Sequence, residues 1–275
     1  MLRPTRPFST RSAPGLPDVT HPRIFIATPT ANGIVMSDHA ASLANMLIRL
    51  HAAGIGAAYR TIDGPDRATE RDMLAADFLR SDCSHLLMLD GNVAFGADLC
   101  ERLLRFAKPV IGGAVTSRAL SPARLRALLE TRPFDQAVML ARDWSVRLDG
   151  GSITVTGGIG RVAALGPEFL LIERAALQAL ADRPETDRYL SPDGRAELAA
   201  LFRDTRYGSA VVSHDQRFCE QWREAGGEVW LYPAADIRRI GEARFGVPFS
   251  QFLAALKRQA DASGPPAPLA SDTAG

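Results

Sequence analysis

Short apolar runs that alternate with helical segments limit most strongly what the first 115 residues can fold into. Such runs occur at Arg23–Ala27, Ile55–Ile62, Leu86–Leu89 and Pro109–Val115. A short apolar run bounded by turn residues is typical of a strand that is buried on both faces. Between these runs, apolar residues recur every three or four positions, as they do on one face of a helix. Alternating strands and helices predict βαβ units and a mostly parallel sheet.

The pattern changes in the second half of the chain. Trp144–Leu148 and Ser152–Thr156 alternate around Asp149-Gly150-Gly151, which predicts a β-hairpin. Phe169–Ile172 is a further strand, and residues 183–210 are polar and turn-rich, so a mobile loop is expected there. We therefore predict an α/β fold with a single domain: a Rossmann-like, mostly parallel sheet, an added hairpin and an antiparallel C-terminal part.

Composition sets the expected limits of this domain. Residues 1–22 hold five prolines and residues 261–275 are rich in Pro, Ala and Ser, so a disordered leader and a disordered tail are expected. The folded body then spans 23–260. No apolar run approaches the ~18 residues of a membrane span, so no integral membrane segment is predicted.

Charge and cysteine content restrict partners and location. The net charge is +1, and the 32 basic residues are spread along the chain, so no nucleic-acid partner is expected. Cys83, Cys100 and Cys219 are far apart and odd in number, which argues against a disulfide framework. Such cysteines are typical of a reducing compartment and predict a cytoplasmic protein.

Polar residues follow four of the predicted strands, namely Thr28, Asp63, Asp90 and Thr116. Ligands of open α/β sheets bind beyond the carboxyl ends of the strands, so these four residues are expected on one rim. Asp90 lies in the stretch HLLMLDGNVAF, which spans 85–95. It is a candidate ligand-binding acid, and the alternative is an Asp that only caps the following turn.

Five segments, in this order, resemble the GT-A type nucleotide-sugar glycosyltransferases, in particular bacterial and phage members of the family-2-like group. These segments are Ile24–Thr30 with the strand ending at Asp63, Glu70–Asp72 leading into His85–Asp90, Val110–Ala114, Leu165–Arg174, and Ser213–Pro233 with Ile240-Gly241. The resemblance covers nearly all of the folded body. It implies a nucleotide-binding half at about 23–118 and an acceptor half at about 119–260.

The resemblance also implies an activity and a set of site residues. A sugar would pass from a nucleotide-sugar donor to a hydroxyl of an unknown acceptor, which is a saccharide, a lipid or a protein. Asp215 would be the general base and Asp90 would lie at the diphosphate. The implied donor-binding residues are Thr28, Pro29, Asp63, Arg71, Asp90, Asn92 and Arg239.

Members of this family hold Mn²⁺ or Mg²⁺ on the diphosphate with an Asp-x-Asp loop and a His, and this sequence departs from both. The loop reads Asp90-Gly91-Asn92, and Arg239 stands at the position of the His. An amide brings no charge to a cation, whereas a guanidinium can itself pair with a diphosphate. Asp90 is the remaining candidate metal ligand, and weak or no metal dependence is expected. A surface pair formed by Arg238 and Arg239 is the alternative.

Other interpretations stay open from the sequence. Asp215 is equally well placed to be the N-cap of the helix that follows it. The alternative for the whole chain is an inactive glycosyltransferase-like domain that binds a ligand or a partner. A nucleotidyltransferase is less favoured because the Gly/Lys-rich first loop is absent. The sequence also has no P-loop, nucleophile elbow or G-x-G-x-x-G after a strand.

Overall fold

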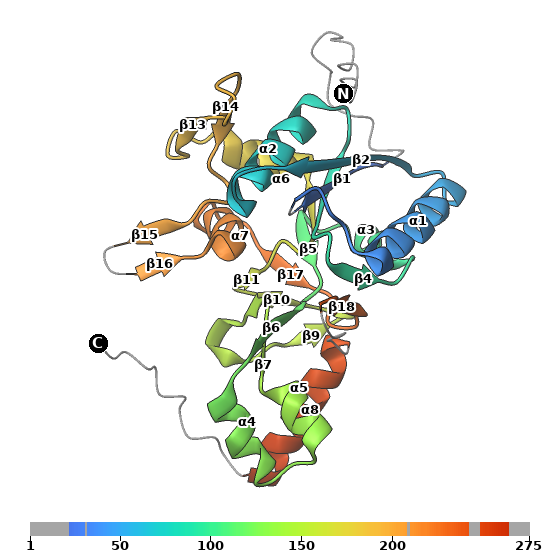
Figure 1. Cartoon of the computed structure of the whole chain (residues 1–275), viewed down its shortest axis with the longest axis vertical. Coiled ribbons are helices and arrows are strands. Elements are labelled where there is room, and N and C mark those ends of the chain that lie inside the picture. Colours follow the sequence, from blue (N-terminus) through green and yellow to red (C-terminus); the bar gives the residue numbers. More distant parts are fainter. Residues whose placement is uncertain (1–21, 31, 208–209, 242–247, 264–275) are drawn as a thin grey trace.

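An eight-stranded sheet forms the centre of the protein (Figure 1). The computed structural model describes residues 22–30, 32–207, 210–241 and 248–263. The strands lie in the order β2, β1, β3, β12, β5, β17, β10, β9. Their bounds are β1 Arg23–Thr30, β2 Gly56–Asp63, β3 His85–Leu89, β5 Val110–Gly112, β9 Val155–Thr156, β10 Ile159–Val162, β12 Phe169–Glu173 and β17 Val229–Leu231.

Most strands of the sheet run in one direction. β1 pairs in parallel with β2 and β3, and β17 pairs in parallel with β5. β12 lies antiparallel between β3 and β5, and β10 lies antiparallel between β17 and β9. Only β12 and β10 therefore oppose the other six strands of this sheet. The predicted single α/β domain with a mostly parallel sheet and antiparallel later strands is confirmed.

Helices cover both faces of the sheet (Figure 1). One face packs against α1 Ser37–Ala52 and α3 Leu99–Arg105, and the other packs against α2 Arg67–Arg80, α6 Arg174–Ala181 and α7 His214–Glu224. Side chains of β1 alternate between the two cores: Ile24 and Ile26 join the first, and Phe25 and Ala27 join the second. Burial on both faces requires apolar residues at successive positions, which is why the apolar runs locate the strands.

The remaining helices form a group at one end of the molecule (Figure 1), and the remaining strands form separate pairs. The helical group consists of α4 Pro122–Leu129, α5 Phe134–Leu140 and α8 Phe249–Ser263. The strand pairs are β6 Thr116–Leu120 with β7 Arg142–Trp144, β4 Val93–Phe95 with β18 Ile237–Arg239, β8 Val146–Arg147 with β11 Ala164–Leu165, β13 Arg188–Leu190 with β14 Glu197–Ala199, and β15 Thr205–Tyr207 with β16 Ala210–Val212.

The hairpin predicted around Asp149–Gly151 is wrong. These residues form a 3-10 turn, and β8, which precedes it, pairs with β11. The hairpin instead joins β9 to β10, with Thr156 opposite Ile159. Its two loop residues are Gly157 and Gly158, whose φ values are 61° and 87°. Two positive φ values are typical of the type I′ turn that closes two-residue hairpins.

The mobile loop predicted at 183–210 is wrong as well, because strands β13, β14 and β15 lie within it. Asp72 of α2 anchors this segment. Its Oδ1 accepts hydrogen bonds from the backbone N–H groups of Leu201 and Phe202 at 3.0 and 2.9 Å, and its Oδ2 accepts one from the Tyr189 hydroxyl at 2.8 Å. Phe202 is then fully buried and stacks on Phe218.

The two predicted disordered ends fall mostly outside the described residues, which begin at 22 and end at 263. α8 continues to Ser263, so the last helix extends past the predicted boundary at 260. Within the described ranges, no helix has the length and apolar character needed to cross a membrane.

Replacing Asp72 tests the anchor of the 183–204 segment. We expect Asp72→Ala to lower the free energy of unfolding by about 3 kcal/mol, because two buried N–H groups and the Tyr189 hydroxyl lose their acceptor. Asp72→Asn keeps the acceptor oxygen for both N–H groups and should cost about 1 kcal/mol or less. Urea denaturation followed by circular dichroism measures both values. Equal losses in the two variants would contradict the anchor.

The same carboxyl group predicts a pH dependence of stability. Burial raises the pKa of Asp72 from 3.8 to about 7, against the opposing effect of its hydrogen bonds. The folded state therefore holds a proton that the unfolded chain releases, so the stabilisation is complete below the unfolded pKa and is lost as the pH rises through about 7. Relative to Asp72→Asn, unfolding of the native protein should cost about 2 kcal/mol more at pH 5 than at pH 8. A difference that does not change with pH would contradict this.

Candidate functional site

A polar cavity of about 540 Å³ opens where β3 ends and β12 begins. This is the rim at the carboxyl ends of the parallel strands, where ligands of such sheets bind. The cavity is lined by Arg67, Arg71, Asp90, Asn92, Ser117, Trp144, Ser145, Gly166, Glu168, Ser213, Asp215, Gln216 and Arg239. Five residues of the predicted site therefore meet here: Arg71, Asp90, Asn92, Asp215 and Arg239.

Two acids meet at the base of this cavity because β12 runs antiparallel to β3. Phe169 lies opposite Leu89, so the residue after β3, Asp90, becomes the neighbour of the residue before β12, Glu168. The backbone N–H of Asp90 donates to the Glu168 carbonyl at 3.1 Å. Both residues are only 6% exposed, which places two carboxyl groups in a largely dehydrated environment.

Arg71 bridges two acids of the cavity. Its Nη1 donates to Asp215 Oδ1 at 2.7 Å and its Nη2 donates to Asp90 Oδ1 at 3.2 Å. The Arg71 side chain is 1% exposed, so its charge depends on these partners. Burial by itself lowers the pKa of Arg71, but the charges of Asp90 and Asp215 outweigh that effect and raise the pKa overall.

Asp215 lies in the first turn of α7 and is not its N-cap. Ser213 is the N-cap, and its hydroxyl accepts a hydrogen bond from the backbone N–H of Asp215. The N-cap interpretation of Asp215 is therefore wrong, and its carboxylate is directed to Arg71 instead. With a side chain that is 43% exposed, Asp215 is more accessible than Asp90 or Glu168.

Arg239 holds the other side of the cavity. Strand pairing of β18 with β4 sets Arg239 opposite Val93. Its Nη2 donates to Glu168 Oε1 at 2.7 Å, its Nε donates to the Thr116 carbonyl at 2.8 Å, and its Nη1 donates to Asn92 Oδ1 at 3.4 Å. The side chain is 11% exposed, whereas Arg238 is exposed and pairs with Asp236. The alternative of a surface Arg pair is therefore wrong for Arg239.

Glu168 is an acid whose pKa is shifted mainly by burial. Dehydration raises its pKa, the charge of Arg239 opposes the shift, and the negative charges of Asp90 and Asp215 add to it. One carboxylate oxygen, Oε2, is buried and has no hydrogen-bond partner among the described residues. This oxygen packs against Gly166, where a Cβ atom would overlap it and also lie 2.8 Å from the Ser145 Cβ. The glycine at 166 thus gives the carboxyl group its space.

The side chains present do not fit a divalent cation. The candidate ligands Asp90 and Asn92 already accept hydrogen bonds from Arg71 and Arg239 through their Oδ1 atoms. Two guanidinium charges at hydrogen-bond distance from the ligands would repel a cation placed between them. In the part of the chain that the structure describes, no group of three His, Cys, Asp or Glu could hold a metal ion.

Three predicted donor-binding residues do not line the cavity. Thr28 and Pro29 are buried at the end of β1, and the Pro29 carbonyl accepts a hydrogen bond from Arg67 at 2.6 Å. Asp63 is exposed at the end of β2, opposite Thr30. These residues share the rim of the sheet with Asp90, as predicted, and the hydrogen bond from Arg67 joins Pro29 to the cavity wall.

Sequence reasoning missed Arg67 and Glu168 as site residues. Arg67 precedes Arg71 by one helical turn, so their common face of α2 was a usable signal. Glu168 lies in the segment Leu165–Arg174, which was recognised only for its resemblance to the family. Its place beside Asp90 depends on the direction of β12, and the apolar run Phe169–Ile172 does not reveal that direction.

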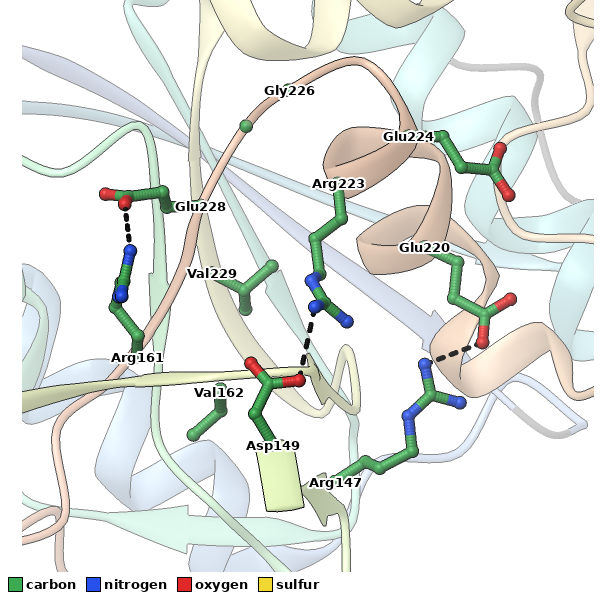
Figure 2. Close-up of a pocket in the computed structure, with 11 residues that line it drawn as sticks. Arg147, Asp149, Arg161, Val162, Glu220, Arg223, Glu224, Gly226, Glu228 and Val229 are labelled. Carbon is green, nitrogen blue, oxygen red and sulfur yellow. Dashed lines mark hydrogen bonds and ion pairs between the residues drawn. The ribbon is translucent and has the colours of Figure 1, made fainter. Parts of the chain in front are cut away.

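A second, larger and more open hollow of about 920 Å³ lies between β10, β17 and the C-terminal end of α7 (Figure 2). Three ion pairs line it: Arg147 with Glu220, Arg223 with Asp149, and Arg161 with Glu228. Exposed ion pairs of this kind contribute little to stability. The hollow contains none of the predicted site residues, so the cavity around Arg71 is the better candidate for the site.

Comparisons with known proteins give distant structural likenesses. No family model matches the sequence, and no curated protein matches it. The protein A197 from STIV is similar with a TM-score of 0.45 and 14% identity, over 80% of this chain and 86% of that one. A Bacillus anthracis protein assigned as a glucose-1-phosphate thymidylyltransferase, solved with sucrose, has a TM-score of 0.39 and 10% identity. The match covers 84% of this chain and 99% of that one. The function is therefore inferred from the cavity's own side chains.

Removing the Arg71 charge tests the electrostatics of the cavity. We expect Arg71→Leu to lower the free energy of unfolding by about 3 kcal/mol or more, mainly because Asp90 would stay buried without a partner. The double variant Arg71→Leu, Asp90→Asn should regain part of this loss. Arg80→Leu removes an exposed Arg of the same helix and should cost about 0.5 kcal/mol or less. Guanidinium chloride denaturation measures all three, and equal losses for Arg71→Leu and Arg80→Leu would contradict the buried network.

Proposed function

We propose that the cavity binds a nucleotide-sugar donor and transfers its sugar to an acceptor hydroxyl, with arginine side chains in place of a metal ion. The observation that carries this proposal is the meeting of Arg67, Arg71 and Arg239 with Asp215 in one cavity beyond the strand ends. The resemblance of the sequence to GT-A type glycosyltransferases supports the same assignment.

The arginines would bind the diphosphate of the donor. Guanidinium groups form paired, charge-assisted hydrogen bonds with phosphate oxygens. Arg71 and Arg239 already have carboxylate partners, so an incoming diphosphate has to replace some of them. Asp215 is the partner most able to leave, because its side chain is 43% exposed while that of Asp90 is 9% exposed. Positive charge at the diphosphate would then stabilise it as a leaving group.

Release of Asp215 from Arg71 would also provide the base. The Asp215 carboxylate lines the cavity at the start of α7, where it would accept the proton of the acceptor hydroxyl. The nucleoside end of the donor is proposed to contact Thr28, Pro29 and Asp63 at the ends of β1 and β2. Because Thr28 and Pro29 are buried, binding there requires Arg67 to leave the Pro29 carbonyl.

A second candidate is a glycosyltransferase-like domain that binds a ligand without catalysis. The observation in its favour is that each of the three acids, Asp90, Glu168 and Asp215, has an arginine partner at 3.2 Å or less. A network with paired charges is stable by itself and does not need a reaction to explain it. Burial of Thr28 and Pro29 also favours this candidate.

Binding in a chelator tests donor recognition. Calorimetric titration with uridine, guanosine and other nucleotide sugars in EDTA should show binding of at least one donor, because the charge on the diphosphate is met by arginines. Arg67→Ala should weaken this binding about tenfold, whereas Arg238→Ala, which removes an exposed Arg outside the cavity, should leave it unchanged. Binding that disappears in EDTA would contradict metal-free recognition. Lack of binding to every donor, with and without Mn²⁺, would favour a partner-binding domain.

Turnover separates the two candidates once a donor is found. Asp215→Asn removes the proposed base at nearly constant size, so donor binding should persist while transfer or donor hydrolysis falls by about 10²-fold or more. Full turnover in this variant would exclude Asp215 as the base. Bound donor that is never hydrolysed or transferred by the native protein would support the binding module.

A further inference from the structure

The Arg239 guanidinium has three oxygen atoms as hydrogen-bond acceptors. Its three nitrogens donate to a carboxylate oxygen of Glu168, to the backbone carbonyl of Thr116 and to the amide oxygen of Asn92. These oxygens come from three separate segments: the residue before β12, the start of β6 and the loop after β3. One side chain with a fixed positive charge thus joins three parts of the cavity wall.

The oxygens around Arg239 are of the kind that hard divalent cations take. Carboxylate, amide and backbone carbonyl oxygens are the usual ligands of Ca²⁺, and Mn²⁺ also accepts them. Glu168 has a further oxygen, Oε2, which is buried and without a hydrogen-bond partner in the described structure. Asp90 lies next to Glu168 through their backbone hydrogen bond. The wall therefore holds more acceptor oxygens than the guanidinium uses.

We propose that the Arg239 guanidinium is the built-in cation of this cavity and fills a latent divalent-cation site. The native protein then takes no divalent ion there, and removal of the guanidinium creates a site for Mn²⁺ or Ca²⁺. Loss of Arg239 leaves Glu168 without the guanidinium it pairs with, while Asp90 keeps Arg71, so the cavity loses one positive charge. This inference concerns the same cavity as the proposed function, but it is tested without a nucleotide.

The test measures the affinity for MnCl₂ and CaCl₂ of metal-stripped full-length proteins by calorimetry and by Mn²⁺ electron paramagnetic resonance. Arg239→Ala should bind Mn²⁺ about tenfold more tightly than the native protein, or better, and the ion should raise its Tm. Arg238→Ala is the matched control, because it removes the preceding, exposed Arg of the same strand and should behave like the native protein. Adding Glu168→Gln to Arg239→Ala should abolish the gain.

Two results would overturn the proposal. One is Mn²⁺ binding to the native protein that is as tight as binding to Arg239→Ala. The other is a folded Arg239→Ala protein with no gain in affinity. If Arg239→Ala is unfolded without metal, refolding on addition of Ca²⁺ supports the proposal. If it stays unfolded with Ca²⁺, Arg239→Gln, which retains a neutral hydrogen-bond donor, decides by the same comparison. Because no donor is present, failure of donor recognition would leave the outcome unaffected.

Discussion

The buried charge of Arg71 is the interaction on which the rest of the cavity depends. A guanidinium with 1% exposure cannot rely on water, so it needs carboxylates from both sides. Asp90 comes from the end of a central strand and Asp215 from the start of α7, and α2 supplies Arg71 itself. If one of these three elements shifted independently, a buried charge would lose its partner. The ion pairs therefore fix the position of α7 over the sheet rim.

Much of the sheet could be predicted because its central strands, such as β1 and β3, are buried on both faces. The same logic found Asp90, since strand ends can be located from apolar spacing, whereas Arg71 came from the resemblance to the GT-A type glycosyltransferases. Sequence reasoning failed where the structure depends on pairing between segments that are far apart in the sequence. Gly150-Gly151 and Gly157-Gly158 both have positive φ, so turn chemistry could not tell which pair closes a hairpin. The pairing of β10 with β17 made that choice. Glu168 and the Asp72 anchor likewise depend on strand direction and on contacts across more than a hundred residues.

In this cavity the acidic side chains pair with arginines, whereas in the resembled family they bind a metal ion. Asp215, Arg71 and Asp90 form one run of contacts, and Glu168, Arg239 and Asn92 form another. A guanidinium differs from a divalent cation because its charge is single, its shape is planar and its hydrogen bonds are directional. The three oxygens around Arg239 each accept a hydrogen bond from a different nitrogen of the guanidinium. Asn92 fits this arrangement, since a neutral amide oxygen is enough to accept one N–H group.

Arginines in place of a metal ion change the interactions that a ligand must make in order to bind. A resident metal ion offers open coordination positions, whereas each arginine here already has a carboxylate partner. An anion therefore has to displace a carboxylate, and it gains only the difference between two charge-assisted pairings. A ligand whose phosphate oxygens meet both Arg71 and Arg239 would gain more from its pairings than the displaced carboxylates lose. A single carboxylate would only exchange one partner for another. Under the proposed function, the paired arginines would therefore favour diphosphates over smaller anions and would disfavour divalent cations.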